Sequence, residues 1–311
     1  MARRTALASL LILTAFACGR TASRRAPEPG VWYVASPSTS PANALEPGFV
    51  FLDSTSLRPV AAGKHSPAQT GVSLFTSFHG TRYHPEALRA VAEDSSVLAA
   101  FGVAFGRTIR SGERTLLIDI QDMSPDDLPR MVAFMRTVAL AFRATRAGPV
   151  AVIVPAGDTV AYPTSVLGRT ADLIVVRLAD EHRPGTRPGP LVTPEFVRRS
   201  LGRRATTLGA SRIGALFPLY GYIWNRDGSA RPISSRDPNP IVNRESGAFR
   251  RDPASSFLTA SGRDGWTIWV PDARTIRTLI DATLERGVTF VALAGPDGAD
   301  PAIIAGDSVK R

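Results

Sequence analysis

The sequence predicts an α/β protein folded as a (β/α)8 TIM barrel. Eight apolar runs of strand length are spread along the 311 residues. Segments with helical periodicity lie between many of them, and apolar strands that alternate with amphipathic helices are typical of a parallel sheet covered by helices. The chain is long enough for one such barrel, and its composition, 44% hydrophobic and 21% charged, is that of a globular protein.

The predicted elements alternate between strand and helix over most of the chain, although the first three units are irregular. The expected strands cover residues 31–35, 49–52, 72–78, 115–120, 150–154, 173–178, 213–217 and 288–293. The expected helices cover residues 85–94, 97–110, 125–143, 194–205 and 272–286. Ser124 and Thr193 stand where they can cap two of these helices, and Gly287 stands where the last one ends.

The segment 222–270 interrupts this alternation between the seventh strand and the last helix. It is polar, rich in Gly, Pro and Arg, and it carries aromatic residues. A long loop that follows a barrel strand lies on the face where such barrels carry their active sites, so we expect an insertion that forms a lid or a small subdomain. An ordinary long surface loop is the alternative.

The N-terminus predicts a secretory signal peptide over residues 1–17. Arg3 and Arg4 form a basic start, and residues 5–16 are an apolar stretch too short to span a membrane comfortably. Cys18, the only cysteine, follows Ala15-Phe-Ala, which resembles the lipobox of bacterial lipoproteins except that alanine replaces the usual leucine. The same Ala-x-Ala pattern suits ordinary signal peptidase, which leaves soluble secretion as the alternative.

Three parts therefore follow one another: the signal peptide, a lipoprotein-type tether over residues 18–29, and the barrel over residues 30–305. The tether is rich in Arg, Ala, Ser and Pro. We expect an exported protein of the bacterial cell envelope, in the periplasm or at the outer membrane, whose membrane contact is a lipid on Cys18.

The net charge of +10 does not predict a nucleic-acid partner. Lys64 and Lys310 are the only lysines among 37 basic residues, and the arginines are scattered. No basic helix with interleaved aromatic residues is visible, and an exported protein rarely meets nucleic acid. Weak attraction to anionic polymers of the envelope is the expected consequence.

The fourth predicted strand carries the clearest candidate site. Strand alternation places Leu117, Asp119 and Gln121 on one face and the isoleucines on the other. Inward-facing residues at the carboxyl ends of barrel strands are where catalytic groups lie. A carboxylate two residues before an amide is therefore a candidate active-site remnant. The alternative for Asp119 is a strand-end carboxylate bonded to backbone N–H groups.

Four segments together resemble one family. They are residues 117–126, with Leu-Ile-Asp-Ile-Gln; 171–190, with Ala-Asp-Glu-His after a strand; 213–224, with Pro-Leu-Tyr-Gly-Tyr-Ile-Trp; and 265–273, with Gly-Trp-Thr-Ile-Trp-Val-Pro-Asp-Ala. Their order is similar to that in glycoside hydrolase family 18, the chitinase-like barrels, and most of all to the branch of spore-germination enzymes. The resemblance covers about residues 115–304.

The resemblance implies hydrolysis next to N-acetylglucosamine with the substrate's acetamido group as nucleophile. It places Asp119 in the position that orients the acetamido group. Gln121 replaces the glutamate that acts as general acid, Ala179 replaces a tyrosine, and Leu117 replaces an inner polar residue. An amide cannot supply a proton near neutral pH, and losing general acid catalysis costs about 10²–10⁴ in rate. The resemblance therefore implies a degenerate catalytic motif, that of a pseudoenzyme.

The remaining candidates contact sugar or replace the lost acid. Asp180 corresponds to a strand-six aspartate that contacts sugar, and either Asp180 or Glu181 is a candidate displaced acid; a solvated loop pair is the alternative. Aromatic side chains can stack on sugar rings. The candidates are Tyr220, Tyr222, Trp224, Trp266 and Trp269, and core packing is the alternative, expected for Trp269 and at least one tyrosine.

Three functions remain open from the sequence. The leading one is a catalytically impaired barrel that binds a glycan containing N-acetylglucosamine, with peptidoglycan or a chitin-like polymer as the natural candidates. The second is an active glycosidase with a relocated acid. The third is a scaffold for protein contacts, which an Arg177 side chain filling the barrel mouth would favour. The spacing of the histidines predicts no metal site, and no motif predicts a cofactor.

Overall fold

The computed structural model describes residues 30–34, 49–52, 56–62, 71–75, 78–79, 82–83, 85–109, 115–145, 148–179, 181–236 and 248–294. The predicted signal peptide, the tether with Cys18, residue Asp180 and the predicted end of the barrel after residue 294 lie outside the described residues. The predictions on export and lipidation therefore stay predictions.

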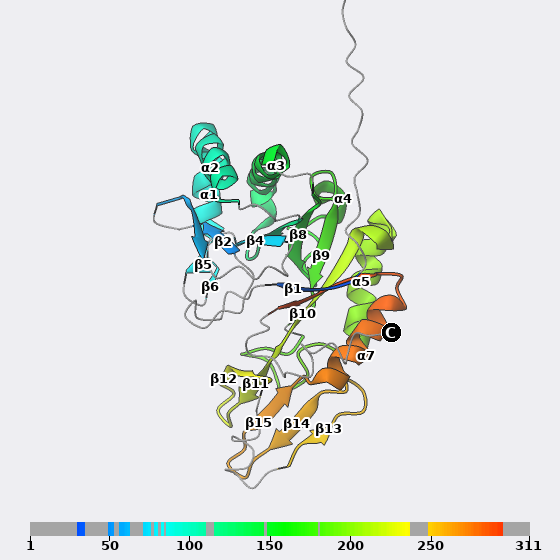
Figure 1. Ribbon diagram of the computed structural model, residues 1–311. Coiled ribbons are helices and arrows are strands. Elements are labelled where there is room, and N and C mark those ends of the chain that lie inside the picture. Colours follow the sequence, from blue (N-terminus) through cyan, green and yellow to red (C-terminus); the bar gives the residue numbers. More distant parts are fainter. Residues whose placement is uncertain are drawn as a thin grey trace, which may run out of the picture.

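Eight parallel strands form the curled sheet that the sequence predicts (Figure 1). Each predicted strand overlaps one of them, and they are β1 (Gly30–Val34), β2 (Phe49–Leu52), β4 (Gly71–Phe75), β7 (Thr115–Asp119), β8 (Val150–Pro155), β9 (Leu173–Arg177), β10 (Ile213–Pro218) and β16 (Phe290–Ala294).

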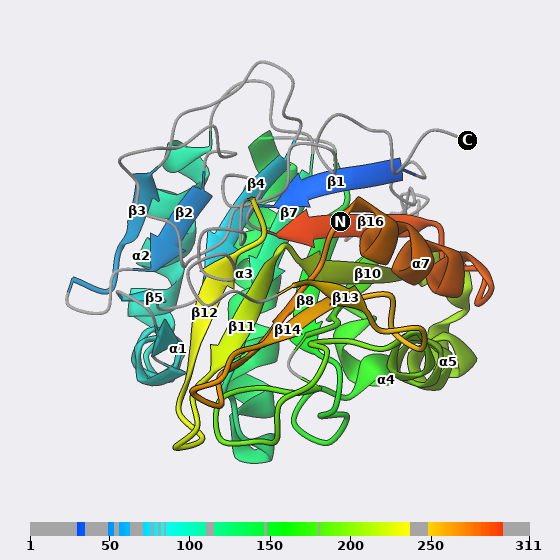
Figure 2. The ribbon, with the colours of Figure 1, turned by 90° about the horizontal axis from the view of Figure 1, so that it is seen from below.

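The strand order is β1-β16-β10-β9-β8-β7-β4-β2, with β3 (Pro59–Ala62) antiparallel at the end. The first and last strands of the barrel, β1 and β16, lie side by side in Figure 2. Within the described ranges no pairing joins β1 to β2, so the sheet is a barrel open at that seam. A small hairpin, β5 (Phe78–His79) with β6 (Arg82–Tyr83), lies outside this sheet.

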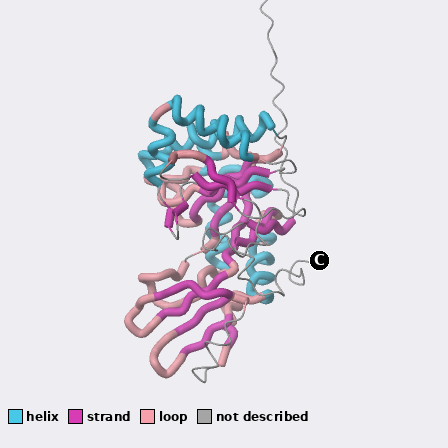
Figure 3. The backbone as a smooth tube through the Cα atoms, turned by 60° about the vertical axis from the view of Figure 1, so that its left-hand side comes forward, coloured by secondary structure: helices cyan, strands magenta, loops and turns pink. Residues whose placement is uncertain are grey.

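The helices cover the outer face of the sheet (Figure 3). They are α1 (Pro85–Glu93), α2 (Ser95–Thr108), α3 (Leu128–Thr145), the short α4 (Thr164–Leu167), α5 (Pro194–Leu208) and α7 (Ala273–Leu284), with 3-10 turns η2 (Pro125–Asp127) and η3 (Ala210–Arg212). The five predicted helices are thus confirmed. Two details differ. α2 begins at Ser95, two residues before the predicted start, with Asp94 as its cap through the Ser96 N–H, and the segment that Ser124 caps begins as a 3-10 turn.

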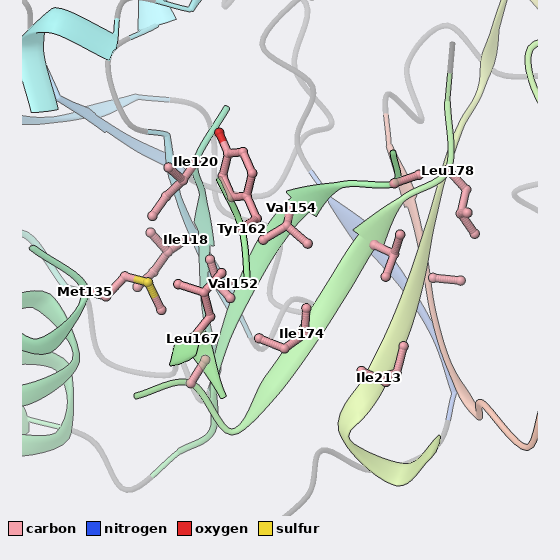
Figure 4. Packing of buried hydrophobic residues seen from close by; sticks show 14 of the residues in the cluster. Ile118, Ile120, Met135, Val152, Val154, Tyr162, Leu167, Ile174, Leu178 and Ile213 are labelled. Atoms are coloured by element: carbon pink, nitrogen blue, oxygen red, sulfur yellow. The ribbon is translucent and has the colours of Figure 1, made fainter. Parts of the chain in front are cut away.

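Strand alternation divides the barrel into two apolar layers. Leu116, Ile118 and Ile120 point outward into the core between sheet and helices. Figure 4 shows Ile118 and Ile120 within this core. Leu117 points inward, where it packs with Ile153, Leu173, Val175, Leu216 and Phe290 inside the barrel. Burying each of these side chains fully contributes about 1.5–3 kcal/mol. The predicted assignment of faces in the fourth strand is confirmed.

The predicted insertion forms a small antiparallel sheet. Its strands are β11 (Tyr220–Trp224), β12 (Ala230–Ser234), β13 (Arg250–Arg251), β14 (Leu258–Ser261) and β15 (Thr267–Val270), in the order β12-β11-β15-β14-β13. β11 begins two residues after the carboxyl end of β10, which places this subdomain at the carboxyl-end face of the barrel. None of the described helices is both long and apolar enough to cross a membrane.

Candidate functional site

Three polar side chains meet inside the barrel at the carboxyl ends of β7 and β9. Asp119 ends β7 on its inward face, and Gln121 follows two residues later on the same face. Arg177 ends β9 two residues after Val175, which also faces inward. Asp119 is 1% exposed, Gln121 6%, and the Arg177 side chain 24%. Asp119 and Gln121 are therefore buried, and the side chain of Arg177 beside them is partly exposed.

Both oxygens of the Asp119 carboxylate accept hydrogen bonds within this cluster. The Gln121 amide donates from Nε2 to Asp119 Oδ1 at 2.7 Å, and the same nitrogen lies 3.5 Å from the carbonyl oxygen of Ile153. Arg177 donates from Nη2 to Asp119 Oδ2 and forms an ion pair with it. The predicted neighbourhood of Asp119 and Gln121 is thus present. Both of these donors are side chains, whereas the alternative for Asp119 expected backbone N–H groups as donors.

This geometry limits the chemistry. Gln121 directs its N–H toward Asp119, and an amide N–H is not an acid near neutral pH. The Arg177 charge compensates the buried carboxylate, which would otherwise carry a large desolvation cost. The cluster can orient and hydrogen-bond a ligand, and the Gln121 amide within it is not a general acid.

The chain leaves the site through a turn that the sequence did not predict. Asp122 takes a left-handed conformation, with φ of 58°, and its side chain is exposed. The next N–H, that of Met123, donates to the buried Tyr162 hydroxyl at 2.9 Å. Burial raises the pKa of Tyr162, so the hydroxyl stays protonated over the physiological range. Tyr162 fixes the position of the β7 end from the following unit of the barrel.

Arg204 on α5 is a second buried residue that sequence reasoning missed. It is 1% exposed and donates to the carbonyl oxygens of Tyr162, Pro155 and Asp158 at 2.8–3.0 Å and to Thr164 Oγ1 at 3.0 Å. Burial lowers the pKa of Arg204 to about 10, which leaves it charged at neutral pH. An arginine in an amphipathic helix is usually on the exposed face, so the sequence carried no signal for this role.

The segment after β9 holds the other predicted site residues. Ala179 is half-buried at the position that the resemblance gives to a tyrosine, and Asp180 lies outside the described residues. Glu181 Oε2 accepts from the N–H and the hydroxyl of Thr193, both at 2.8 Å. Thr193 in turn caps α5. Glu181 therefore closes the loop 182–192 onto the helix. Its role as a displaced acid or sugar contact stays a prediction that this engagement disfavours.

The aromatic residues of β11 line one side of that strand, as predicted, but they face the core. Adjacent rings lie 5.5 Å apart, from Tyr220 to Tyr222 and from Tyr222 to Trp224, in edge-to-face contacts. Trp224 is 1% exposed and Tyr222 is buried, so the expectation that they stack on sugar is corrected to core packing. Tyr220 and Trp269 are half-buried, and a sugar contact at either one stays a prediction.

Trp266 belongs to the second small core on the other face of the insertion sheet. The expected packing role of one tyrosine thus applies to Tyr222. Across the sheet, Tyr222 pairs with Trp269 in the β11–β15 register.

Within the described ranges, no group of three or more His, Asp or Glu side chains is placed to hold a metal ion. A groove of about 710 Å³ lies between α2 and α3 and is lined by small and apolar residues that include Leu98, Gly102 and Leu140. It belongs to the outer helical layer, not to the strand ends.

Comparisons with known proteins agree with the fold. No family model matches the chain. A protein described as an uncharacterized glycosylase, YvbX of Bacillus subtilis (strain 168), is 23% identical over 128 residues, which cover 38% of this chain and 36% of that protein. The chain thus aligns with about a third of this relative's length.

Among solved structures, the match to a chitinase from Chromobacterium violaceum ATCC 12472 covers 91% of this chain and 100% of the chitinase, with a TM-score of 0.74 and 19% identity. The chain has the fold of the chitinases. The spore cortex-lytic enzyme SleL of Bacillus cereus covers 88% of this chain and 72% of its own, with a TM-score of 0.69 and 14% identity. A third neighbour is a class V chitinase of Nicotiana tobaccum, a glutamate-to-glutamine mutant in complex with NAG4. The match covers 88% of this chain and 95% of the chitinase, with a TM-score of 0.64 and 15% identity.

These neighbours confirm the predicted TIM-barrel fold and the resemblance to glycoside hydrolase family 18 at the level of the fold. Identities below 20% in these structures show the fold alone.

Proposed function

We propose that this chitinase-like barrel binds a glycan containing N-acetylglucosamine at its carboxyl-end mouth and does not hydrolyse it. The observation that carries the proposal is the Gln121–Asp119 hydrogen bond of 2.7 Å, buried at the strand end where the resemblance places the general acid. The amide fills the position of a carboxyl group of nearly equal size, so the site keeps its shape and loses its proton donor.

The comparisons support binding in two ways. Several solved neighbours are named as chitinases or cortex-lytic enzymes, and one of them is a glutamate-to-glutamine mutant in complex with NAG4. A glutamine in place of a glutamate is therefore compatible with an occupied binding cleft in this fold.

Calorimetry with chitotetraose and a turnover assay with a chromogenic chitooligosaccharide test the proposal together. We expect measurable binding and no turnover by the wild-type chain. Turnover at an appreciable rate would contradict the proposal. If the active-glycosidase alternative held, Glu181→Ala would abolish that turnover, whereas here Glu181 serves Thr193 and the variant should only loosen the loop.

The ion pair of Arg177 and Asp119 favours the scaffold alternative as a second candidate function. Arg177 ends β9 beside Asp119, and only part of its side chain is exposed. If chitotetraose fails to bind, a protein contact replaces the sugar as the expected role.

We also propose export and lipid anchoring on Cys18, on the strength of the N-terminal pattern. Expression in a bacterial host with a radiolabelled fatty acid tests this: the chain should carry label and sediment with membranes. Cys18→Ala should release an unlabelled protein. An unlabelled wild-type chain in the soluble exported fraction would support ordinary secretion instead.

A further inference from the structure

We propose that the outer face of α2 and α3 binds the surface of an anionic phospholipid bilayer. The contact is centred on the groove of about 710 Å³ between the two helices. Its exposed apolar side chains enter the acyl region of the bilayer, and its arginines contact the headgroup phosphates. This surface is separate from the strand ends, so the inference goes beyond the proposed glycan binding, and it does not depend on a lipid at Cys18.

The groove gathers exposed apolar side chains. Among the described residues, four large apolar side chains are exposed, and two of them, Val103 on α2 and Leu140 on α3, line this one groove. Val103 is 59% exposed and Leu140 is 68% exposed. Ala99 and Ala100 are also exposed on α2. A surface helix normally turns polar residues toward water, and an exposed apolar patch marks a contact with a protein or a membrane.

Small residues form the floor between these two side chains. A Cβ at Gly102 would lie 2.6 Å from Thr137 Cγ2, and a Cβ at Gly106 would lie 3.8 Å from the Ala141 Cβ. The two helices therefore pack closely along this line, with Gly102 buried and Gly106 half-buried. An apolar groove of this kind can take up a flexible acyl chain, which needs no hydrogen-bond partners.

Arginine is the only type of charged residue in α2 and α3. Neither helix contains Asp or Glu within its bounds. The arginines are Arg107, Arg130, Arg136 and Arg143. Two of them serve the fold, because Arg130 donates to Glu93 at 2.5 Å and Arg143 donates to Asp172 at 2.8 Å. The two helices thus present a cationic face that carries no carboxylate of its own.

The other two arginines flank the apolar contact. Arg107 lines the groove, and Arg136 is exposed on α3 one turn before Leu140. Neither forms an ion pair with another residue that the structure describes. Asp94, directly before α2, accepts the Ser96 N–H as the helix cap. Apolar side chains beside unpaired arginines match an anionic amphiphile in both kinds of contact.

Charge and position favour a bilayer over a second copy of the chain. A second copy on this face would bring more arginine and no carboxylate of α2 or α3, whereas an anionic bilayer attracts each arginine near its surface. In Figures 1 and 3, α2 and α3 lie at the end of the molecule opposite the insertion sheet, so a bound bilayer leaves that sheet free. The proposed lipid on Cys18 would add a second contact, since the chain from Cys18 to Gly30 reaches at most about 40 Å when extended.

Co-sedimentation with vesicles tests the proposal on the full chain with Cys18→Ala, which carries no lipid. Vesicles of phosphatidylcholine mixed with phosphatidylglycerol should bind this chain about tenfold or more tightly than vesicles of phosphatidylcholine alone. Two arginines that each gain from the anionic surface account for a preference of this size. Added salt should weaken the binding to the mixed vesicles.

Substitutions at exposed positions test the two kinds of contact separately. Val103→Gln/Leu140→Gln removes the apolar contact and should weaken binding to the mixed vesicles about tenfold or more. Arg107→Gln/Arg136→Gln removes the two cations and should weaken it by a similar factor. All four side chains are exposed, and glutamine is a good helix former, so the fold should be retained.

Matched controls change the same residue types on the opposite helices. Leu284→Gln replaces an exposed leucine at the end of α7. Arg203→Gln/Arg274→Gln removes two exposed arginines, one on α5 and one on α7, and lowers the net charge by the same amount. Both controls should weaken vesicle binding far less than the groove variants. Because every variant has the same N-terminus, the differences among them report on the groove.

Three results would overturn the proposal. They are equal binding of the two kinds of vesicle, equal weakening by the groove variants and their controls, and a dimer that Val103→Gln/Leu140→Gln dissociates in sedimentation velocity without vesicles. The last result would assign the groove to a second copy of the chain. Binding of chitotetraose should be the same in all these variants, because the groove belongs to the outer helical layer. Failure of chitotetraose to bind would therefore contradict the proposed function alone.

Discussion

The carboxylate of Asp119 accepts one hydrogen bond from an amide and one from a guanidinium, and both donors come from the strand ends that line the barrel mouth. A single residue thereby connects β7 with β9, two strands away in the sheet. Because Asp119 is 1% exposed and Arg177 is partly exposed, the two partners are not equivalent. Losing the cation leaves a charge buried, whereas losing the carboxylate leaves a cation that can reach water.

This asymmetry predicts the stability of variants at the pair. Arg177→Met should lower the free energy of unfolding by about 3 kcal/mol or more, since it leaves Asp119 uncompensated. Asp119→Asn/Arg177→Met should cost much less, because no buried charge remains. Urea unfolding followed by circular dichroism measures both values. If the single and double variants were equally unstable, the ion pair would not be the reason for the loss.

At the scale of single elements, the start of α3 depends on a buried carboxylate. Asp127 accepts from Arg89 Nε at 2.8 Å and Nη2 at 2.7 Å, and from the N–H and hydroxyl of Ser124 at 2.9 and 2.8 Å. The Arg89 guanidinium is the main cause that holds the pKa of Asp127 well below its usual range. The carboxylate thus fastens α1 to the turn before α3.

Asp127→Asn should lower the unfolding free energy by about 1–2 kcal/mol at neutral pH. Because the folded pKa lies below the unfolded one, the stabilisation is present above the usual pKa of aspartate. It is lost as the pH falls through that range toward the folded value. The difference between variant and wild type should therefore shrink in acid. Asp126→Asn, next in the chain and exposed, is the control and should change little at any pH.

The insertion sheet depends on one glycine. A Cβ at Gly221 would lie 2.2 Å from the Trp269 carbonyl oxygen and 2.8 Å from the Val270 Cα. Gly221→Ala should therefore force β11 and β15 apart and cost about 3 kcal/mol or more. Gly202→Ala is the matched control, because nothing lies within 4 Å of a Cβ at that position of α5. It should stabilise the helix by about 0.5–1 kcal/mol. The unfolding temperatures of the two variants are compared with that of the wild type. If Gly221→Ala left the unfolding temperature unchanged, the close contact between β11 and β15 at this position would be contradicted.

Periodicity made the elements predictable, and long-range contacts made parts of the site unpredictable. The eight strands and the inward face of Leu117, Asp119 and Gln121 follow from alternation within short segments. The bond from Met123 to Tyr162 joins residues 39 apart, and the Arg204 bonds join residues 40 to 49 apart. No local pattern encodes such distances. The aromatic row on β11 shows the same limit, since spacing predicted a shared side but could not decide whether that side meets ligand or core.

At the scale of the whole molecule, the barrel and the insertion share a core. Tyr222 and Trp224 of β11 belong to the same apolar cluster as Ile118 and Phe217 of the barrel, although the far face of the insertion sheet has its own small cluster. The subdomain is therefore part of the barrel's packing and not an appended lid. Deleting it would remove the fully buried Trp224 indole and leave a cavity, at a cost of about 3–5 kcal/mol for that side chain alone.

This shared core predicts that barrel and insertion unfold together. Three of the four tryptophans, Trp224, Trp266 and Trp269, lie in the insertion, so fluorescence reports mainly on it. The helices lie on the barrel, so circular dichroism at 222 nm reports mainly on that part. The two signals should give one coincident urea transition, the mark of two-state behaviour. Trp224→Phe should shift both midpoints equally. An insertion signal that is lost at lower urea than the helical signal would show that the subdomain opens independently and could act as a lid.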